Sequence, residues 1–436
     1  MSAVGARIGL VLLTISAVTG CGDEPLTSTS SRDLGEGAVA AIHAGGKWKA
    51  SWASAPEDYV NSGNPLFSFS NQTIREGVHT SIGGPELRIR FTNLYGAVPL
   101  HIDGAHVALK TSGSGIAPDS DREILFGGSS SATIPAGADL WSDAVKLHFD
   151  DQADLAVSIY LASSTPVGTF HTVAGHDNFV VTGNALSASS LPGAQTLTTA
   201  TQVGVFASSY FISGVDVKTH KKTEVVAVFG ASTEDGIGAT PNGNDGYVAV
   251  LARLLDGEVG VLNLGMGANR LLYDFPIQVF GQRGVLRFSR DVLGQSGVTH
   301  ALLGLGNADI IFGQFFPDPN AGPFFQNPTV EQLEAASEDL LARCAANGVT
   351  CILQTLMPCK GYFFCNQVTE AKRQAYNDWV RGGGHAVADL DAVLRDPGDP
   401  AAILPAYDSG DHLHPNPAGH AALAAEAKRA LHISDD

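Results

Sequence analysis

Apolar and polar residues alternate in short runs over the first half of the chain. Residues 87–91 and 145–149 follow this period of two closely, and residues 155–161 follow it more weakly. Such a period predicts strands with one buried face. Clusters of Gly, Pro, Asn and Asp separate the runs. Many short strands at this spacing predict an all-β sandwich, jelly-roll-like, for residues 47–218.

Continuous apolar runs replace this alternation after Thr223. They occupy residues 225–229, 259–263, 300–305 and 349–356. A strand that is apolar at every position is buried on both faces, which is typical of a parallel sheet covered by helices. Residues 219–436 are therefore predicted to form a three-layer α/β domain with a flavodoxin-like parallel sheet.

Helix signals lie between and after these runs. The segment 329–347 starts with a Thr-x-x-Gln capping box and ends before Gly348, which predicts both ends of a helix. The segment 370–381 stops at three glycines. Asn416-Pro417 supplies a cap and a favourable first residue for the last helix.

The first 20 residues have the pattern of an export signal. Arg7 precedes the apolar stretch 8–20, which is too short to span a bilayer comfortably. Cys21 follows directly, as in a bacterial lipobox, so we expect a lipid anchor there; an ordinary cleaved signal is the alternative. Residues 21–46, rich in Ser, Thr, Gly and Ala, predict a flexible tether. The protein is expected to be exported, as a cell-envelope lipoprotein or otherwise secreted, and to contact a membrane only through Cys21.

The remaining four cysteines agree with export. They fall at Cys344, Cys351, Cys359 and Cys365. Four cysteines allow three pairings, of which we favour the two local ones, 344–351 and 359–365. A zinc site is a weaker alternative, because no C-x-x-C spacing is present. Free buried thiols are the other alternative.

The net charge narrows the possible partners. It is −18, from 26 basic and 44 acidic residues. A nucleic-acid binder needs a basic surface, and docking on anionic lipid needs one too, so both classes are disfavoured. No apolar run of 18 or more residues follows the N-terminus, so the body of the chain is not expected to span a membrane.

A serine and an Asp-x-x-His pair indicate nucleophilic catalysis. Ser232 follows the first apolar strand of the second half, at the end where open parallel sheets bind ligands. Asp411 and His414 stand three residues apart, and a serine nucleophile needs a base together with an acceptor that orients it. Taken alone, Ser232 is more often a helix cap. An Asp/His cluster also suits a metal, although no third and fourth ligand stand out nearby.

Four blocks in this half resemble the SGNH (GDSL-like) hydrolase superfamily. The blocks are residues 230–236, 263–270, 306–310 and 408–419. Residues 71–75, 81–84 and 88–93 resemble the β-sandwich that precedes the hydrolase domain in one extracellular branch of this family. The resemblance implies that Ser232 is the nucleophile, His414 its base and Asp411 the third member of a triad.

The resemblance further implies an esterase or acylhydrolase that needs no metal or organic cofactor. Its oxyanion hole is expected to comprise the backbone N–H groups of Ser232 and Ala268 and the amide of Asn307. Three positions depart from the family pattern. Ala231 replaces the usual Asp, and Ala268 replaces the usual Gly. In the third block Ala308 stands where the family has Asn, and the amide of Asn307 comes one residue early.

Substrate contacts are predicted on both sides of the nucleophile. Asn269 and Arg270 either position the substrate or knit the second block together. Phe315 and Phe316 begin a Phe/Pro-rich loop that either lines an acyl pocket or forms loop core. The expected partner is a small-molecule or glycan ester. Two other functions stay open, a catalytically weak or silent relative that binds glycan, and an acyltransferase that uses the same triad.

Overall fold

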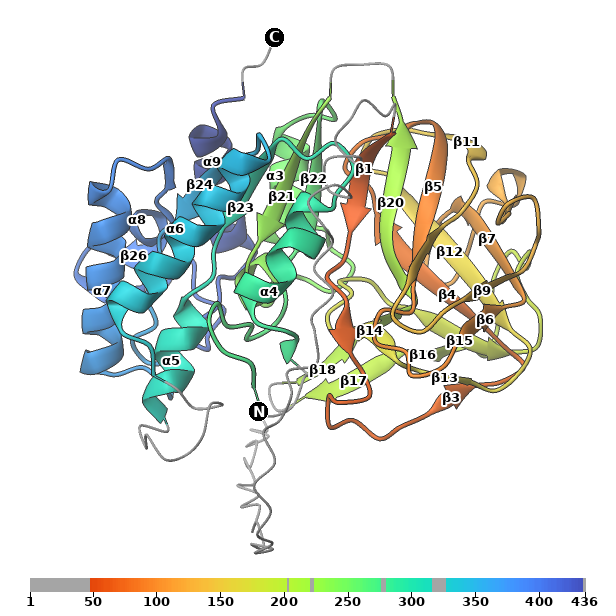
Figure 1. The fold of residues 1–436 in the computed structure, drawn as a ribbon, viewed down its shortest axis with the longest axis horizontal. Helices are drawn as coiled ribbons and strands as arrows, with labels where there is room; N and C mark the ends of the chain where they lie inside the picture. Colours follow the sequence, from red (N-terminus) through yellow and green to blue (C-terminus); the bar gives the residue numbers. More distant parts are fainter. Residues whose placement is uncertain (1–47, 202–203, 220–222, 276–279, 316–326, 434–436) are drawn as a thin grey trace, which may run out of the picture. The chain divides into compact units, whose positions relative to one another are not determined.

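The computed structural model describes residues 48–201, 204–219, 223–275, 280–315 and 327–433. The predicted signal at 1–20, the lipidation site Cys21, the tether at 21–46 and Phe316 lie outside these residues. Figure 1 shows the chain as a ribbon, with strands prevailing in its first half and helices in its second.

Two antiparallel sheets form most of the first half (Figure 1). One has the order β1-β20-β5-β10, with β11 also paired to β5, and the other has the order β16-β15-β4-β12-β7-β8. The strands of the first sheet are β1 Trp48–Ala53, β5 Gly84–Thr92, β10 Asp139–Trp141, β11 Val145–Phe149 and β20 Ile212–Lys218. Those of the second are β4 Gln72–His79, β7 Gly104–Leu109, β8 Arg122–Ile124, β12 Asp154–Leu161, β15 Phe179–Thr182 and β16 Gln195–Thr196.

Small ribbons complete this β-rich half. They comprise β2 Glu57–Asp58, β3 Ser68–Phe69, β6 Leu100–Ile102, β9 Ala132–Ile134, β13 Thr165–Pro166, β14 Thr169–His171, β17 Thr198–Thr201, β18 Gly204–Ala207 and β19 Ser209–Tyr210. Of these, β14 pairs with β2 and β19 and carries His171, which lies next to the candidate site.

The alternation seen in the sequence builds the core between the two large sheets. In β11 the residues are buried and exposed in strict turn, as expected for a strand with one wet face. Apolar side chains of β4, β5, β12 and β20 meet in one buried cluster, including Ile74, Ile89, Val157 and Val215. The predicted all-β architecture is therefore confirmed.

A parallel sheet forms the centre of the second half, with the order β22-β21-β23-β24-β25. Its strands are β21 Glu224–Phe229, β22 Val259–Leu264, β23 His300–Leu303, β24 Thr350–Gln354 and β25 Val387–Ala388. In β21, Val225 and Ala227 enter one core cluster, whereas Val226 and Val228 enter another. The strand is thus buried on both faces, which accounts for its continuous apolar run.

Helices supply the other wall of each cluster, so the predicted three-layer α/β fold is confirmed. Helices α4 Gly284–Phe288, α5 Asn307–Phe315, α6 Val330–Ala346 and α7 Gln367–Gly382 contribute to one face. Helices α3 Tyr247–Leu254, α8 Leu390–Leu394 and α9 Pro417–Leu431 contribute to the other. A further short ribbon pairs β26 Arg395–Asp396 with β27 Asp399–Ile403.

The predicted helix ends are confirmed where a cap marks them. Thr329 accepts a hydrogen bond from Gln332 N at the start of α6, and Asn416 accepts one from Gly419 N at the start of α9. Helix α7 begins three residues before the predicted start at 370, because Asn366 caps it. Its side chain accepts hydrogen bonds from two backbone N–H groups, and such a residue is a strong N-cap.

Strand β1 covers the outer edge of the parallel sheet. Ala50 N donates to Ser296 O at 2.9 Å, and Val261 N of the edge strand β22 donates to Ser81 Oγ at 2.9 Å. An added Cβ at Gly260 would lie 2.4 Å from Ala50 O, so this close approach requires glycine. The edge of the parallel sheet is therefore covered by the β-rich half of the same chain.

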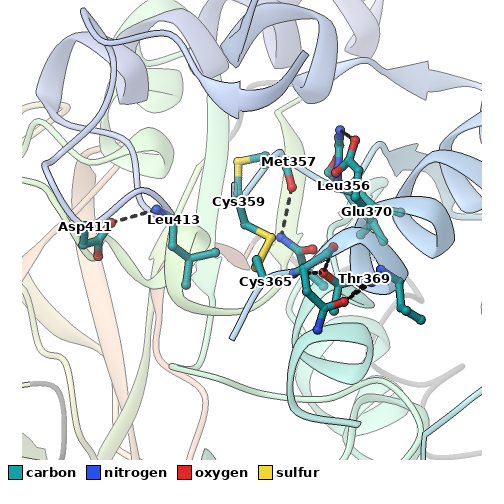
Figure 2. The surroundings of a disulfide bond; sticks show 12 residues. Leu356, Met357, Cys359, Cys365, Thr369, Glu370, Asp411 and Leu413 are labelled. Atoms are coloured by element: carbon teal, nitrogen blue, oxygen red, sulfur yellow. Dashed lines mark hydrogen bonds and ion pairs between the residues drawn. A yellow bond between two sulfur atoms is a disulfide. The ribbon is translucent and has the colours of Figure 1, made fainter. Parts of the chain in front are cut away.

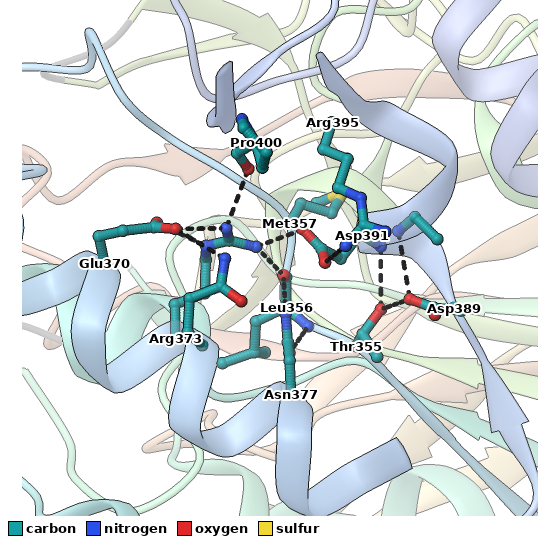
Figure 3. Close-up of polar contacts among 12 residues, drawn as sticks. Thr355, Leu356, Met357, Glu370, Arg373, Asn377, Asp389, Asp391, Arg395 and Pro400 are labelled. Carbon is teal, nitrogen blue, oxygen red and sulfur yellow. Dashed lines mark hydrogen bonds and ion pairs between the residues drawn. The ribbon is translucent and has the colours of Figure 1, made fainter. Parts of the chain in front are cut away.

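Two disulfides and a buried ion cluster brace the far side of this sheet. Cys344 bonds Cys351, and Cys359 bonds Cys365, so the favoured pairing is confirmed. Figure 3 shows the cluster around Arg373, which is 1% exposed. Its guanidinium donates to Asp391 Oδ1 at 2.5 Å, to Leu356 O at 3.0 Å and to both carboxylate oxygens of Glu370. These contacts join α7 to α8 and to the end of β24.

Candidate active site

Ser232 stands at the carboxyl end of the central strand β21. The strand ends at Phe229, and the short helix α2, Ser232–Asp235, begins three residues later. Gly230 has no room for a side chain, because an added Cβ would lie 2.1 Å from Glu234 Oε2. The carboxylate of Glu234 accepts a hydrogen bond from Ala231 N at 2.9 Å. This tight turn holds the Ser232 hydroxyl at the strand end, where parallel sheets bind ligands.

The structure brings Ser232, His414 and Asp411 together in one hydrogen-bonded chain. His414 Nε2 lies 2.8 Å from Ser232 Oγ, although 182 residues separate them in sequence. His414 Nδ1 lies 2.5 Å from Asp411 Oδ2. A carboxylate only accepts hydrogen bonds, so Nδ1 carries the proton and Nε2 presents its lone pair to the serine hydroxyl. The imidazole is therefore oriented as a general base for Ser232.

Asp411 is held as an acceptor by its own loop. Its Oδ1 accepts hydrogen bonds from His414 N at 2.8 Å, Leu413 N at 2.9 Å and Ser409 Oγ at 3.0 Å; Figure 2 shows the bond to Leu413. Burial raises the pKa of Asp411, but the hydrogen bonds and the charge of His414 outweigh it and hold that pKa well below its ordinary value. The carboxylate is consequently ionised at neutral pH.

The loop of residues 265–268 passes beside α2. Gly267 N donates to Asp235 Oδ2 at 2.8 Å, and the next residue, Ala268, has φ of 54°. This left-handed conformation suits glycine and costs an alanine about 1–2 kcal/mol. The alanine that departs from the family pattern thus keeps a backbone conformation typical of glycine.

Asn307 lies at the start of α5 and is partly buried. Its Nδ2 donates to Met357 O at 3.3 Å. Its Oδ1 is buried and has no hydrogen-bond partner among the described residues. One amide hydrogen is therefore engaged by Met357, which leaves the other for a ligand. Ala308, at the position where the family has Asn, is buried and offers no side-chain donor.

Asp309 ties the third block to the second. It accepts hydrogen bonds from Leu271 N at 2.6 Å and from Leu272 N at 3.0 Å. Burial raises the pKa of Asp309 to about 6, although Arg270 and these N–H groups oppose the rise. The carboxylate fixes the chain directly after the residues that were predicted to touch substrate.

Asn269 and Arg270, which were predicted to position the substrate or to knit the second block together, have buried side chains. Both residues are 1% exposed. Asn269 Nδ2 donates to the carbonyl oxygens of Phe280 and Gln282 at 2.7 and 2.9 Å. The guanidinium of Arg270 lies over the ring of Tyr273, at 5.0 Å. Arg270 Nε also lies 3.8 Å from Asp309 Oδ1. These contacts favour the alternative interpretation, in which the two residues knit the loop together.

A row of aromatic rings runs from this loop towards the triad. Phe275 packs on Phe280 and on Phe312, and Phe312 packs on Phe364, with ring centroids 4.8, 5.3 and 5.7 Å apart. Phe364 also contacts Tyr362, and Asp411 raises the pKa of Tyr362 in addition to the larger effect of burial. Phe315 closes α5, and its side chain, like Phe316, is not described.

A buried carboxylate–histidine cluster lies behind Ser232, and no sequence motif predicted it. His171 Nε2 lies 3.0 Å from Asp235 Oδ1, and His171 Nδ1 lies 2.9 Å from Ala55 O and 3.2 Å from Glu57 Oε1. Asp235 belongs to the first block, but 64 residues separate it from His171. No short motif links the two positions.

A cavity of about 420 Å³ lies beside this cluster. Trp52 and His79 of the β-rich half line it, together with Asp235, Ile237 and Val248 of the second half. Ser232 and His414 are not among its lining residues, so the cavity lies beside this pair and does not contain it. In the described part of the chain, no three His, Cys, Asp or Glu side chains are placed to hold a metal ion together.

Comparison with known proteins places the second half in a family. The model of the GDSL-like Lipase/Acylhydrolase family matches residues 228–422. No curated protein matches the chain.

Three similar solved structures each cover about half of the chain. A GDSL-like lipase from Bacteroides thetaiotaomicron is 17% identical, with 48% of this chain and 87% of that chain covered and a TM-score of 0.35. An α/β hydrolase from the metagenome of Lake Arreo is 21% identical, with 48% and 94% covered and a TM-score of 0.36. An acetylxylan esterase from Geobacillus stearothermophilus is 18% identical, with 49% and 96% covered and a TM-score of 0.35. The match of the family model, by contrast, shows that residues 228–422, which hold Ser232, Asp411 and His414, are a domain of the GDSL-like lipase/acylhydrolase family.

Proposed function

We propose that this protein is a serine esterase that hydrolyses carboxylic esters through an acyl-enzyme. The observation that carries the proposal is the chain of hydrogen bonds from Asp411 through His414 to Ser232, at 2.5 and 2.8 Å. Side chains of this kind in contact are the signature of an activated nucleophile. The match of residues 228–422 to an acylhydrolase family also supports this proposal.

In the proposed reaction His414 Nε2 accepts the proton of Ser232 as Oγ attacks the ester carbonyl. The tetrahedral intermediate collapses, the C–O bond to the alcohol breaks, and His414 returns the proton to the leaving oxygen. Water then attacks the acyl-enzyme with His414 again as base, which releases the acid and restores the hydroxyl. Asp411 stays ionised throughout and stabilises the imidazolium.

The oxyanion is proposed to bind at the backbone N–H groups of Ser232 and Ala268. Ser232 opens α2, and the first N–H groups of a helix have no partner within the helix. The second amide hydrogen of Asn307 is the proposed third donor. Loss of one such donor typically costs about a hundredfold in rate.

The proposed substrate is a small-molecule or glycan ester, with its acyl group on the aromatic row. Three of its rings are partly exposed, Phe312, Tyr362 and Phe364. The charge of Asp411 contributes to the raised pKa of Tyr362, which indicates that this ring lies near the triad. Partly exposed rings beside a nucleophile offer apolar area for an acyl chain.

We also propose that the protein is exported and that Cys21 carries its lipid anchor. The signal-like residues 1–20 support this, as do the two disulfides, which form mainly in oxidising compartments. No helix in the described part of the chain has the length and apolar character needed to cross a bilayer.

Covalent labelling tests the proposed function without knowledge of the natural ester. Residues 22–436 are treated with a fluorophosphonate, and the intact mass is measured. We expect one adduct on the wild type and on Ser112→Ala, which removes an exposed hydroxyl of the β-rich half, and none on Ser232→Ala. A well-folded wild-type protein that takes no adduct would overturn the esterase proposal.

A further inference from the structure

His171 joins the β-rich half of the chain to the block that carries Ser232. It lies at the end of β14 and is 7% exposed. Its ring lies between two carboxylates, Glu57 on β2 and Asp235 on α2, each with a side chain 1% exposed. Glu57 Oε2 also accepts a hydrogen bond from Thr172 Oγ1 at 2.5 Å. These residues form a buried ion cluster that joins two parts of the fold whose residues are far apart in the sequence.

The neighbours of His171 determine its protonation state. Nδ1 faces Ala55 O and Glu57 Oε1, and Nε2 faces Asp235 Oδ1, so both ring nitrogens point at acceptors. A ring with two acceptors must donate from both nitrogens, which only the imidazolium can do. Burial lowers the pKa of His171, but Asp235 and Glu57 outweigh it and raise that pKa well above its ordinary value.

The cluster continues to the loop of the proposed oxyanion hole. Asp235 uses Oδ1 for His171 and Oδ2 for Gly267 N, at 3.0 and 2.8 Å. Gly267 precedes Ala268, whose φ of 54° holds the loop in a conformation unfavourable for alanine. An added Cβ at Gly265 would lie 2.1 Å from Asp235 N, so the loop is pressed against α2. A strained loop keeps its shape only where its surroundings fix it.

We propose that His171 is a positioning residue for the esterase reaction. By donating to Asp235, it fixes the carboxylate that holds Gly267 N, and so aims the N–H group of Ala268 at the oxyanion. The β-rich half is then a part of the active site and not only a neighbour of it. The inference rests on the proposed function, because it assigns a role within that reaction.

The test compares His171→Leu, which removes both donors, with His171→Gln, which keeps one donor without the charge. His106→Leu is the matched control, because His106 also pairs with a carboxylate, Asp121 at 3.0 Å, but does so inside the β-rich half. Each protein is titrated with fluorophosphonate to count competent sites. The labelling rate per competent site and the kcat and KM for p-nitrophenyl acetate are then measured.

We expect the labelling rate per site and kcat to fall about tenfold to hundredfold in His171→Leu, as for a small misplacement of a catalytic group. His171→Gln should fall less, and His106→Leu should match the wild type. KM should stay nearly constant, because an oxyanion donor acts in the transition state. A fall in the number of competent sites with an unchanged rate per site would overturn the proposal, since it marks a purely structural role.

A double-mutant cycle decides whether the effect runs through Asp235. We expect Asp235→Asn to slow labelling, and His171→Leu added to it to slow labelling little further, because residues that act through one contact are not additive. Additive losses would overturn the proposed route. If His171→Leu does not fold, His171→Gln with Asp235→Asn completes the same cycle. An unlabelled wild type would instead refute the esterase function itself, whereas a labelled wild type with unaffected variants refutes only the role of His171.

Discussion

At the scale of single residues, Glu234 makes stability depend on pH. It lies two residues from Ser232, and burial raises its pKa from 4.5 to about 7. The folded chain therefore holds this proton more tightly than the unfolded chain does. The stabilisation is complete below about pH 4.5 and is lost as the pH rises through 7. Over that range the loss amounts to about 3 kcal/mol.

Glu234→Gln should remove this dependence, because the amide is neutral at every pH and its oxygen can still accept from Ala231 N. We expect the variant to unfold several degrees above the wild type at pH 8.5 and near the same temperature at pH 4.5. Thermal melts followed by circular dichroism give both values. Glu123→Gln, at an exposed position of β8, is the control. Equal shifts at both pH values would contradict the assignment of the proton to Glu234.

Sequence predicted the residues whose partners lie close along the chain. Asp411 and His414 are three positions apart, so the carboxylate and the base share one loop and the pair is visible as a motif. His171 and Asp235 face each other only after the two halves have folded, and nothing local records the contact. The contacts of Asn269 could also not be predicted without the fold. A polar residue after a motif has the same sequence pattern whether its side chain points at substrate or at the carbonyls of its own loop.

At the scale of elements, the two disulfides form a matched pair with different neighbours. They close loops of similar length, between residues 344 and 351 and between 359 and 365. The first joins α6 to β24. The second (Figure 2) closes a loop that touches the triad loop, since an added Cβ at Gly361 would lie 2.9 Å from the His412 ring. The two should therefore contribute alike to stability but differently to catalysis.

Replacing either pair of cysteines by alanine should lower the free energy of unfolding by about 2 kcal/mol, as expected for loops of this size. We expect only the Cys359→Ala/Cys365→Ala protein to lose labelling rate per competent site, by severalfold, because the loop beside Asp411 and Tyr362 is released. Urea unfolding and fluorophosphonate kinetics on the two variants measure both effects. Equal labelling rates would show that the second loop has no part in positioning the triad.

Elements were predictable where period and caps agree. The apolar runs identified four of the five strands of the parallel sheet, and the caps at Thr329 and Asn416 located the helix starts. The fifth strand, Val387–Ala388, has only two residues, and no period can be read from so short a segment. The order of the strands in the sheet could not be predicted from the sequence either, because it depends on which strands the crossover connections bring side by side.

At the scale of the whole molecule, the two halves differ in how far their apolar cores depend on residues of the other half. In the described part of the chain, the buried core of the β-rich half comprises residues between Tyr59 and Val217, with Trp52 packed against it, and all of these lie within the predicted domain 47–218. The core of the α/β half includes Ala50 and Ala53, both 1% exposed. Strand β22 at the edge of the parallel sheet also lies under β1. The apolar core of the first half is therefore built from its own residues, whereas the apolar core of the second half is not.

We accordingly expect residues 47–218 to fold alone and residues 219–436 to fail when expressed alone. Without the first half, the second exposes the edge of β22 and the apolar surface that Ala50 and Ala53 cover, and an uncovered edge strand pairs with other copies. It also leaves Asp235 without the His171 imidazolium, as a buried charge that has lost its partner. Size-exclusion chromatography and thermal melts of both fragments, beside residues 22–436, measure the difference. A monomeric 219–436 fragment with a cooperative melt close to that of the longer chain would show that this domain folds without the β-rich half over its sheet edge. Full labelling of that fragment at the wild-type rate would also show that the β-rich half has no role in the active site.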